Sequence, residues 1–319
     1  MPLLSITELP DLVGLPPQAP ADDPAWRDIL GAMFDPEDGG AETYALVDAC
    51  KWPGLPETLD ASGLTYRCLF QGKAKEELGE AAPWLVQLTP DATFCRWLWT
   101  DDRENDVPWH LWGRDAAVIL RSPVGFDRLH AHLRRKIRIL DMQGNALYFR
   151  FWDPFHLMTF VSSAAATEAD KLWLLSDQQG GVVSQLICSA DDRSFRVDMP
   201  PDLPACRSGF RLSDPLRAAF VAAVAARAQA HDIAAVQKLF PRAPADLLGQ
   251  ERAQLIALGF RQPAPIRAAL CLCAHRKAAI SALPEAEREI LNATRQSDQA
   301  RIRLLYRAAG NWPQPDAQP

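Results

Sequence analysis

The sequence predicts an α/β N-terminal lobe, with a mixed sheet and flanking helices, followed by an all-α C-terminal lobe. Three observations support this fold class. Apolar runs of strand length alternate with helical patterns up to about residue 205, strand patterns end near residue 210, and the segment 214–230 is rich in alanine. We therefore expect an N-terminal extension with one short helix (1–40), an α/β domain (41–205), a helical lobe (206–310) and a Pro-rich tail (311–319).

Local signals place the elements of the first lobe. Asp23-Pro24 predicts the start of a short helix, because Asp is a good N-cap and Pro suits the first helical turn. Ser122-Pro123 predicts a second helix start, and Gly180-Gly181 predicts a hairpin turn. Strands are expected at 43–48, 65–70, 84–88, 116–120, 137–140, 146–152, 173–176, 182–188 and 194–198. Helices are expected at 73–78 and 90–99, and loops at 36–40 and 101–108.

The second lobe is predicted to contain only helices, beginning at Asp214-Pro215. The alanine-rich helix has small residues on several sides. This allows either close packing within the lobe or a groove that receives an amphipathic segment of another protein. The expected helices are 214–230, 233–240, 244–258, 264–279 and 285–308.

Composition excludes several classes of protein. The net charge is −6 and the pI about 5.6, so no basic field predicts binding to nucleic acid. The longest apolar runs fall short of the roughly 18 residues that cross a bilayer, and the N-terminus does not resemble a signal peptide, so we expect no membrane association. The seven cysteines form no framework, which indicates free thiols in a reducing cytoplasm.

The run LYFRFWDP carries one arginine among aromatic residues. Alternation puts bulky side chains on both faces of 147–152, which predicts an inner strand covered on both sides. Arg150 would then need an ion pair, for which Asp48 and Asp153 are the candidates. We interpret Asp153-Pro154 as a helix cap rather than as catalytic chemistry, since caps and buried ion pairs are commoner than active-site carboxylates.

These residues also carry a resemblance to a known family. FRFWDP is similar to the FRfyDP signature of domain-of-unknown-function family 4123, with Trp152 in place of the usual Tyr. Other stretches are similar in the expected order, and the resemblance spans about 44 to 160. These stretches are YALVDA (44–49), CLFQG (68–72), APWLVQL (82–88), WGRDAAVILRS (112–122) and LHAHLRR (129–135).

The resemblance implies a function without catalysis, because members of this family are adaptor chaperones of type VI secretion effectors. It implies that the chain binds a cognate effector in the bacterial cytoplasm and promotes its loading onto the VgrG spike, through direct or indirect contact. No catalytic residue, cofactor or metal is then expected. Two alternatives remain open, a small hydrolase with dispersed site residues and a structural component of the secretion apparatus. An adaptor should co-purify with its effector in near-equal amounts, whereas an enzyme should not.

Residue patterns typical of catalysis or metal binding are weak. Cys271-x-Cys273 with His275 is the main Cys/His cluster, but positions two apart on a helix point in different directions, which favours buried structural cysteines. No G-x-S-x-G elbow, G-x-G-x-x-G or P-loop is present. Cys95 and His110 could form a dyad, but a packed Cys95 in an aromatic helix is the favoured interpretation.

The predicted loop at 101–108 is acidic, and four tryptophans lie near it, at positions 97, 99, 109 and 112. The candidate effector-binding residues come from this group. Tryptophan is enriched at interface hot spots, because one side chain buries a large area at low entropic cost. Trp109, in the polar loop, is the preferred exposed candidate, and Trp99 and Trp112 are further candidates. The alternative is that tryptophans fill the α/β core, and we favour it for Trp97 and Trp112.

Overall fold

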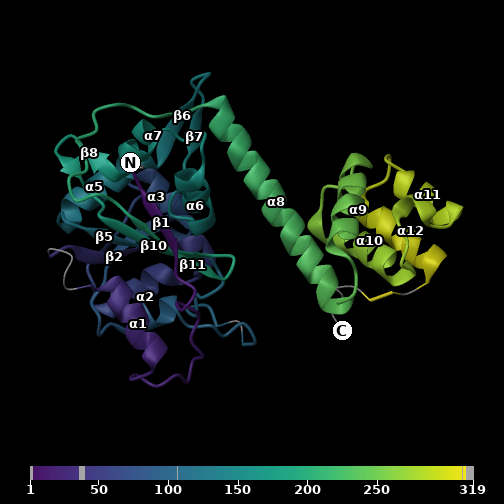
Figure 1. Cartoon of the computed structure of the whole chain (residues 1–319), viewed down its shortest axis with the longest axis horizontal. Coiled ribbons are helices and arrows are strands. Elements are labelled where there is room, and N and C mark those ends of the chain that lie inside the picture. Colours follow the sequence, from purple (N-terminus) through teal and green to yellow (C-terminus); the bar gives the residue numbers. More distant parts are fainter. Residues whose placement is uncertain (1–2, 36–39, 106, 311, 314–319) are drawn as a thin grey trace. The chain divides into compact units, whose positions relative to one another are not determined.

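The computed structural model describes residues 3–35, 40–105, 107–310 and 312–313. It divides into two compact units, Met1–Phe220 and Val221–Pro319 (Figure 1). The first unit contains a seven-stranded sheet with helices, and the described part of the second contains only helices, so the predicted fold class is confirmed. Most of the predicted loop at 36–40 and of the expected tail lies outside the described residues.

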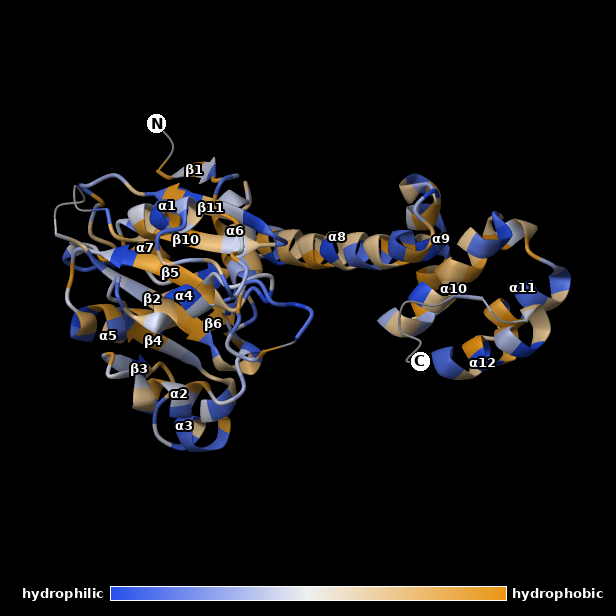
Figure 2. Ribbon diagram, turned by 90° about the horizontal axis from the view of Figure 1, so that it is seen from below, coloured by the Kyte–Doolittle hydropathy of each residue, from blue (hydrophilic) through white to orange (hydrophobic). Residues whose placement is uncertain are grey.

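The main sheet of the first unit has the strand order β1-β11-β10-β5-β2-β4-β3, and all its neighbouring strands are antiparallel. Its central strands β5 and β10 are mostly hydrophobic (Figure 2), as expected for strands buried on both faces. Two small sheets have the orders β12-β6-β7 and β8-β9. The bounds are β1 Ser5–Glu8, β2 Glu42–Asp48, β3 Tyr66–Cys68, β4 Pro83–Gln87, β5 Ala117–Ser122, β6 Arg138–Asp141, β7 Ala146–Tyr148, β8 Ser176–Asp177, β9 Gly180–Gly181, β10 Gln185–Ala190, β11 Arg193–Asp198 and β12 Arg211–Leu212.

Seven α-helices accompany these sheets among the described residues, and the first begins as predicted. The Asp23 carboxylate accepts a hydrogen bond from the Ala25 N–H at 2.9 Å, and Pro24 occupies the first helical position. The bounds are α1 Pro24–Met33, α2 Leu55–Ser62, α3 Lys73–Leu78, α4 Thr93–Leu98, α5 Phe126–Lys136, α6 Pro154–Ser162 and α7 Glu168–Leu175, with the 3-10 helices η1 Ala49–Lys51 and η2 Gly79–Ala81.

Strand β2 divides the interior of the first unit into two cores. Tyr44 and Leu46 point into the core that α5, α6 and α7 cover, whereas Ala45 and Val47 point into the core that α1, α2 and α4 cover. All four residues are fully buried, because successive side chains of a strand point to opposite faces and both faces here carry helices. The second core holds most of the tryptophans and supports the candidate site described below.

The second unit has a core of its own, formed by the end of α8 and the helices that follow. The two helices predicted between 214 and 240 are one continuous helix, which begins in the first unit. The helix predicted at 285–308 is instead two helices, because the Ser297 side chain caps the second by accepting a hydrogen bond from the Ala300 N–H at 3.3 Å. The bounds are α8 Asp214–Leu239, α9 Ala245–Ala257, α10 Pro263–Arg276, η3 Ile280–Ala282, α11 Glu285–Asn292 and α12 Asp298–Ala309.

The inner strand predicted at 147–152 is wrong. Strand β7 ends at Tyr148, after which the chain turns, and the Asp153 N–H donates to the Arg150 carbonyl at 3.1 Å. Tyr148 is 57% exposed and the Arg150 side chain 41% exposed, so the run is not covered on both sides. Alternating bulky residues therefore do not form a buried strand here, because a turn redirects the side chains after β7.

Three further local predictions are corrected. WLLS at 173–176 lies mostly in α7, because Thr167 and Asp170 form a capping box that starts a helix. Gly180-Gly181 form β9 and follow the hairpin turn rather than making it. Ser122 belongs to β5, and the N-cap of α5 is Gly125, so Ser122-Pro123 does not cap that helix.

Candidate protein-binding site

An apolar groove of about 530 Å³ lies on the first unit, formed by α2, α4 and the loop that follows α4. Trp109 is 43% exposed, and its ring centroid lies 6.3 Å from that of Trp97. None of the described residues that line the groove is charged, so it suits the apolar groups of a ligand. The lining residues are Thr58, Ala61, Ser62, Leu64, Ala92, Thr93, Phe94, Trp97 and Trp109.

Trp52 supports the groove from below. It is 1% exposed, and its ring stacks on Phe94 at a centroid distance of 5.0 Å and an interplanar angle of 23°. The edge of Trp97 meets the same ring at 6.0 Å and 79°. Because Trp52 contacts two lining residues in favourable aromatic geometry, it fixes the shape of this surface.

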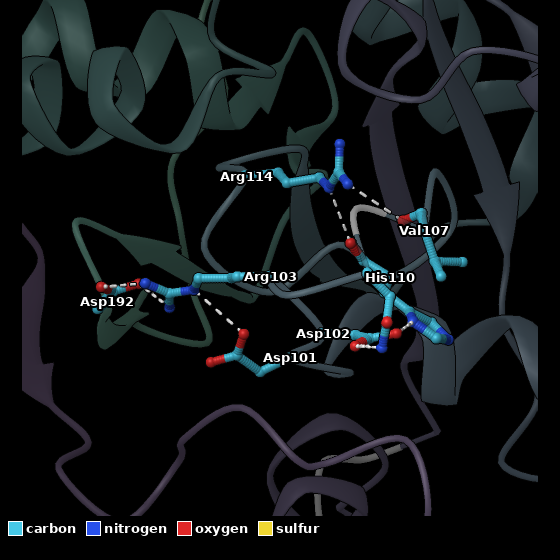
Figure 3. A network of polar contacts seen from close by, with 8 residues as sticks. Asp101, Asp102, Arg103, Val107, His110, Arg114 and Asp192 are labelled. Atoms are coloured by element: carbon cyan, nitrogen blue, oxygen red, sulfur yellow. Dashed lines mark hydrogen bonds and ion pairs between the residues drawn. The ribbon is translucent and has the colours of Figure 1, made fainter. Parts of the chain in front are cut away.

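The loop after α4 is tied to the turn between β10 and β11 (Figure 3). Arg103 donates two hydrogen bonds to the Asp192 carboxylate, at 2.6 and 3.0 Å, and its Nε donates to Asp101 at 3.1 Å. Asp191 and Asp192 both have positive φ, at 52° and 63°, as a two-residue turn with right-handed twist requires. The bidentate pair thus connects two loops that are far apart in sequence.

A second set of contacts holds the backbone on both sides of Trp109 (Figure 3). His110 Nδ1 lies 3.0 Å from a carboxylate oxygen of Asp102. Arg114 donates from Nε to the His110 carbonyl at 2.9 Å and from Nη2 to the Val107 carbonyl at 3.1 Å. Because these contacts hold the described residues on either side of Trp109, binding through Trp109 would cost less conformational entropy.

The prediction that Trp99 and Trp112 contact a partner is corrected. They are 3% and 6% exposed, and their rings stack on each other at 5.5 Å and 28°. The Trp99 indole N–H also points at the Met33 sulfur, 3.2 Å away. Both side chains fill the second core and are inaccessible to another polypeptide. Trp109 is thus the remaining member of the predicted set on the surface.

The charged residues of the LYFRFWDP run have structural contacts. Arg150 Nη2 donates to Asp48 at 2.5 Å, and Asp48 is fully buried, so of the two carboxylates expected for Arg150 the structure pairs it with Asp48. Asp153 accepts hydrogen bonds from the backbone N–H groups of Phe155 and His156 at 3.0 and 3.3 Å, with Pro154 at the first helical position.

Two side-chain nitrogens also lie next to the Asp153 carboxylate. Lys51 Nζ lies 3.1 Å from one carboxylate oxygen and His156 Nδ1 3.3 Å from the other. Burial opposes ionisation of this carboxyl, but the contact with the His156 ring and the charge of Lys51 outweigh it and lower its pKa. The group is therefore a permanent anion that caps α6, which is a structural arrangement.

Replacing Asp153 with alanine should lower the free energy of unfolding by about 2 kcal/mol, because two helix N–H groups and Lys51 lose their acceptor. Asp153→Asn, which keeps an acceptor oxygen, should lose roughly half as much. Since the folded pKa is lowered, the stabilisation is present above the unfolded value near 4 and is lost as pH falls below it. Urea unfolding at pH 7 and pH 3 measures both effects, and equal stability of all three proteins would contradict the capping role.

Cys95 and His110, which were considered for catalysis, have structural contacts in the described part of the chain. The Cys95 thiol donates to the Thr89 carbonyl at 3.1 Å, and burial raises its pKa to about 12, so it is protonated at neutral pH. His110 faces Asp102 in a polar cavity of about 210 Å³, whose described lining includes no Ser, Thr or Cys. In the described part of the chain no three His, Cys, Asp or Glu side chains gather closely enough to hold a metal ion.

The fold and groove define an α/β domain with an apolar surface beside an exposed tryptophan. Comparison with protein families shows a match for most of this domain. Residues 43–171 match the model of the family described as Domain of unknown function (DUF4123), and this part of the chain is a DUF4123 domain. The match runs from β2 into the first turn of α7 and includes every described residue that lines the groove.

No curated protein and no solved structure gives a significant match to the chain. Among the described helices, none combines the length and the apolar character needed to cross a bilayer.

The α2 side of the groove was not predicted from the sequence. Thr58 and Ala61 are small residues three apart on a short helix, and they carry no functional signal by themselves. The tertiary fold brings this helix next to α4, where both line the groove. The exposed aromatic at Trp109 was the detectable signal, since a tryptophan in an acidic loop has no obvious role in a core.

Proposed function

We propose that the chain is an adaptor chaperone, which binds a cognate type VI secretion effector in the bacterial cytoplasm and promotes its loading onto the VgrG spike. The observation that carries this proposal is the uncharged apolar groove with an exposed Trp109 inside the DUF4123 domain. A large aromatic on an ordered loop beside a hydrophobic groove is typical of an interface hot spot. The chain then acts by binding and not by turnover.

The groove would shield an apolar segment of the effector. Burial of apolar surface contributes about 25 cal/mol per Å² before the costs of association are subtracted. The ordered loop around Trp109 reduces one of these costs. Release follows when the spike takes over the same segment, since two partners that need one surface compete for it.

A small hydrolase is the less favoured alternative. Its support would be the His110–Asp102 contact, which resembles two members of a catalytic triad. However, the described lining of that cavity offers no hydroxyl or thiol nucleophile, and Arg103 and Arg114 use their donors on Asp192 and backbone carbonyls. These contacts favour a role in ordering the loop.

Deletion of the gene should abolish export of one effector while the secretion apparatus keeps working, and Trp109→Ser should weaken effector binding about tenfold. Effector export is measured in the native bacterium, and affinity is measured by calorimetry with the purified pair. Tyr148→Ser is the matched control, because Tyr148 is an exposed aromatic of the same domain outside the groove and should change neither result. Normal export of every effector from the deletion strain would reject the adaptor role.

A further inference from the structure

The two units of the chain carry opposite charge. Residues 221–319 contain 13 Lys and Arg against 8 Asp and Glu, a net charge of +5, so the whole-chain value of −6 leaves −11 for residues 1–220. The positive net charge of the helical unit favours anionic partners, which the whole-chain charge does not indicate.

A second apolar groove, of about 560 Å³, lies on this cationic unit. It is formed by the end of α8, the start of α9 and the end of α10. Leu239 is 40% exposed, which leaves a large aliphatic side chain available to a partner. The apolar lining includes Leu239, Phe240, Pro244, Leu247, Leu248 and Ala274, and we call this groove the α8–α10 groove.

The connection between α8 and α9 keeps this groove open. Pro241 and Pro244 restrict two of its backbone φ angles. The Ala243 N–H donates to the Phe240 carbonyl at 2.9 Å, and the Gln237 side chain donates to the Ala243 carbonyl at 2.9 Å. The α8–α10 groove is therefore preformed, which is a condition for tight binding of a short segment.

Two cations stand at the edge of the groove without a partner. Arg242 and Lys277 line it and are exposed, and neither forms an ion pair with another described residue. The described lining contains no carboxylate. Several other cations of the unit are neutralised locally. These are Arg252 and Arg267 with Asp232, Arg276 with Glu287, and Arg301 with Asp298.

The start of α9 leaves this cationic edge in place. Its N-cap is Pro244, which offers no side-chain acceptor, and Asp246 in the first turn offsets the positive end of the helix dipole. An anionic side chain next to an apolar anchor would therefore pair with Arg242 and Lys277.

We propose that the α8–α10 groove binds an amphipathic segment whose apolar side chains are flanked by Asp or Glu. This inference rests on the proposed function in one respect, which is that the segment belongs to the effector. Apolar side chains would fill the volume beside Leu239 and Leu247, and the acidic residues would pair with Arg242 and Lys277. The neutral groove at Trp109 would then hold a different, uncharged segment of the same client.

The test uses the full chain and two labelled amphipathic peptides that share their leucine positions and differ in carrying Glu or Lys on the polar face. Fluorescence anisotropy should show that the Glu peptide binds at least about tenfold more tightly than the Lys peptide. The double variant Arg242→Glu, Lys277→Glu should weaken the Glu peptide about tenfold and strengthen the Lys peptide. Ala274→Trp, which fills the groove, should weaken both peptides.

The double variant Arg303→Glu, Arg307→Glu is the matched control, since it makes the same change in net charge at exposed positions of α12 outside the groove. It should leave the preference for the Glu peptide intact. The proposal is overturned if the wild-type chain binds neither peptide, if it shows no preference, or if the control reduces binding as much as the groove variant. Circular dichroism establishes that each variant is folded.

The peptide measurement separates this inference from the adaptor role. If deletion of the gene stops effector export but the groove variant binds the Glu peptide as the wild type does, the inference fails and the adaptor role stands. If the groove variant alters peptide preference as expected while export of every effector is normal in the deletion strain, the α8–α10 groove stands as a peptide-binding site and the adaptor role fails.

Discussion

Replacing Trp52 with alanine should lower the free energy of unfolding of the first unit by about 3–5 kcal/mol, the largest effect expected of a single substitution. The side chain is 1% exposed and packs on both Phe94 and Trp97, so its removal leaves a cavity that these rings cannot fill without moving. Urea unfolding followed by tryptophan fluorescence measures the change in the first unit, because nine of the ten tryptophans lie before residue 221.

Trp109→Ala provides the control for this measurement, because Trp109 is 43% exposed and its loss should cost less than about 1 kcal/mol. Trp52→Phe, which retains an aromatic ring, should fall between the two. A loss below 1 kcal/mol for Trp52→Ala would mean that the groove is not supported from below by this residue. Because Phe94 and Trp97 line the groove, Trp52→Ala should also weaken effector binding although Trp52 itself is buried.

His132 should make the protein lose stability as the solution becomes mildly acidic. Its ring is 3% exposed and Nε2 donates to the Leu174 carbonyl at 2.7 Å. Burial lowers its pKa from 6.5 to about 4, and the charge of Lys136 acts in the same direction. The unfolded chain therefore binds a proton between pH 6.5 and 4 that the folded chain excludes, and stability falls by about 3 kcal/mol over this range.

The variant His132→Gln isolates this contribution, because glutamine can still donate to the Leu174 carbonyl but does not titrate. The difference in unfolding free energy between the variant and the wild type should change by about 3 kcal/mol between pH 7 and pH 4, in favour of the variant at low pH. Parallel pH profiles for the two proteins would contradict the expected pKa of His132.

The sequence was sufficient to predict the fold class, because several elements have strong local signals. Asp23-Pro24 and Asp153-Pro154 mark helix starts that the structure reproduces, and the run 43–48 becomes the inner strand β2. These signals are local, so they do not depend on how the chain folds back on itself.

The failures arise where a cap or turn nearby in the sequence competes with the propensity of a run. The run 147–152 alternates like a strand, but the turn before α6 ends β7 at Tyr148. WLLS has strand propensity, yet the capping box at Thr167 starts a helix that continues to Leu175. In both cases a cap or turn a few residues away decides the structure, and the propensity of the run itself is overridden.

The candidate site was predictable only in part. Exposure of Trp109 followed from its polar surroundings, but Trp99 and Trp112 have similar neighbours in sequence and lie in the core. The difference depends on which residues α1 and the N-terminal segment cover, as the contact of Trp99 with Met33 shows. Such coverage joins positions more than 60 residues apart and leaves no trace in a local pattern.

The two-sided burial of β2 limits how this chain can change in length over evolution. Insertion or deletion of a single residue between Glu42 and Asp48 would exchange the partners of Tyr44 and Ala45, and every following side chain of the strand would enter the wrong compartment. Natural relatives should therefore tolerate insertions and deletions in the loop at 101–108 but not in β2. In β2, a shift of one residue would move every side chain to the opposite face of the sheet.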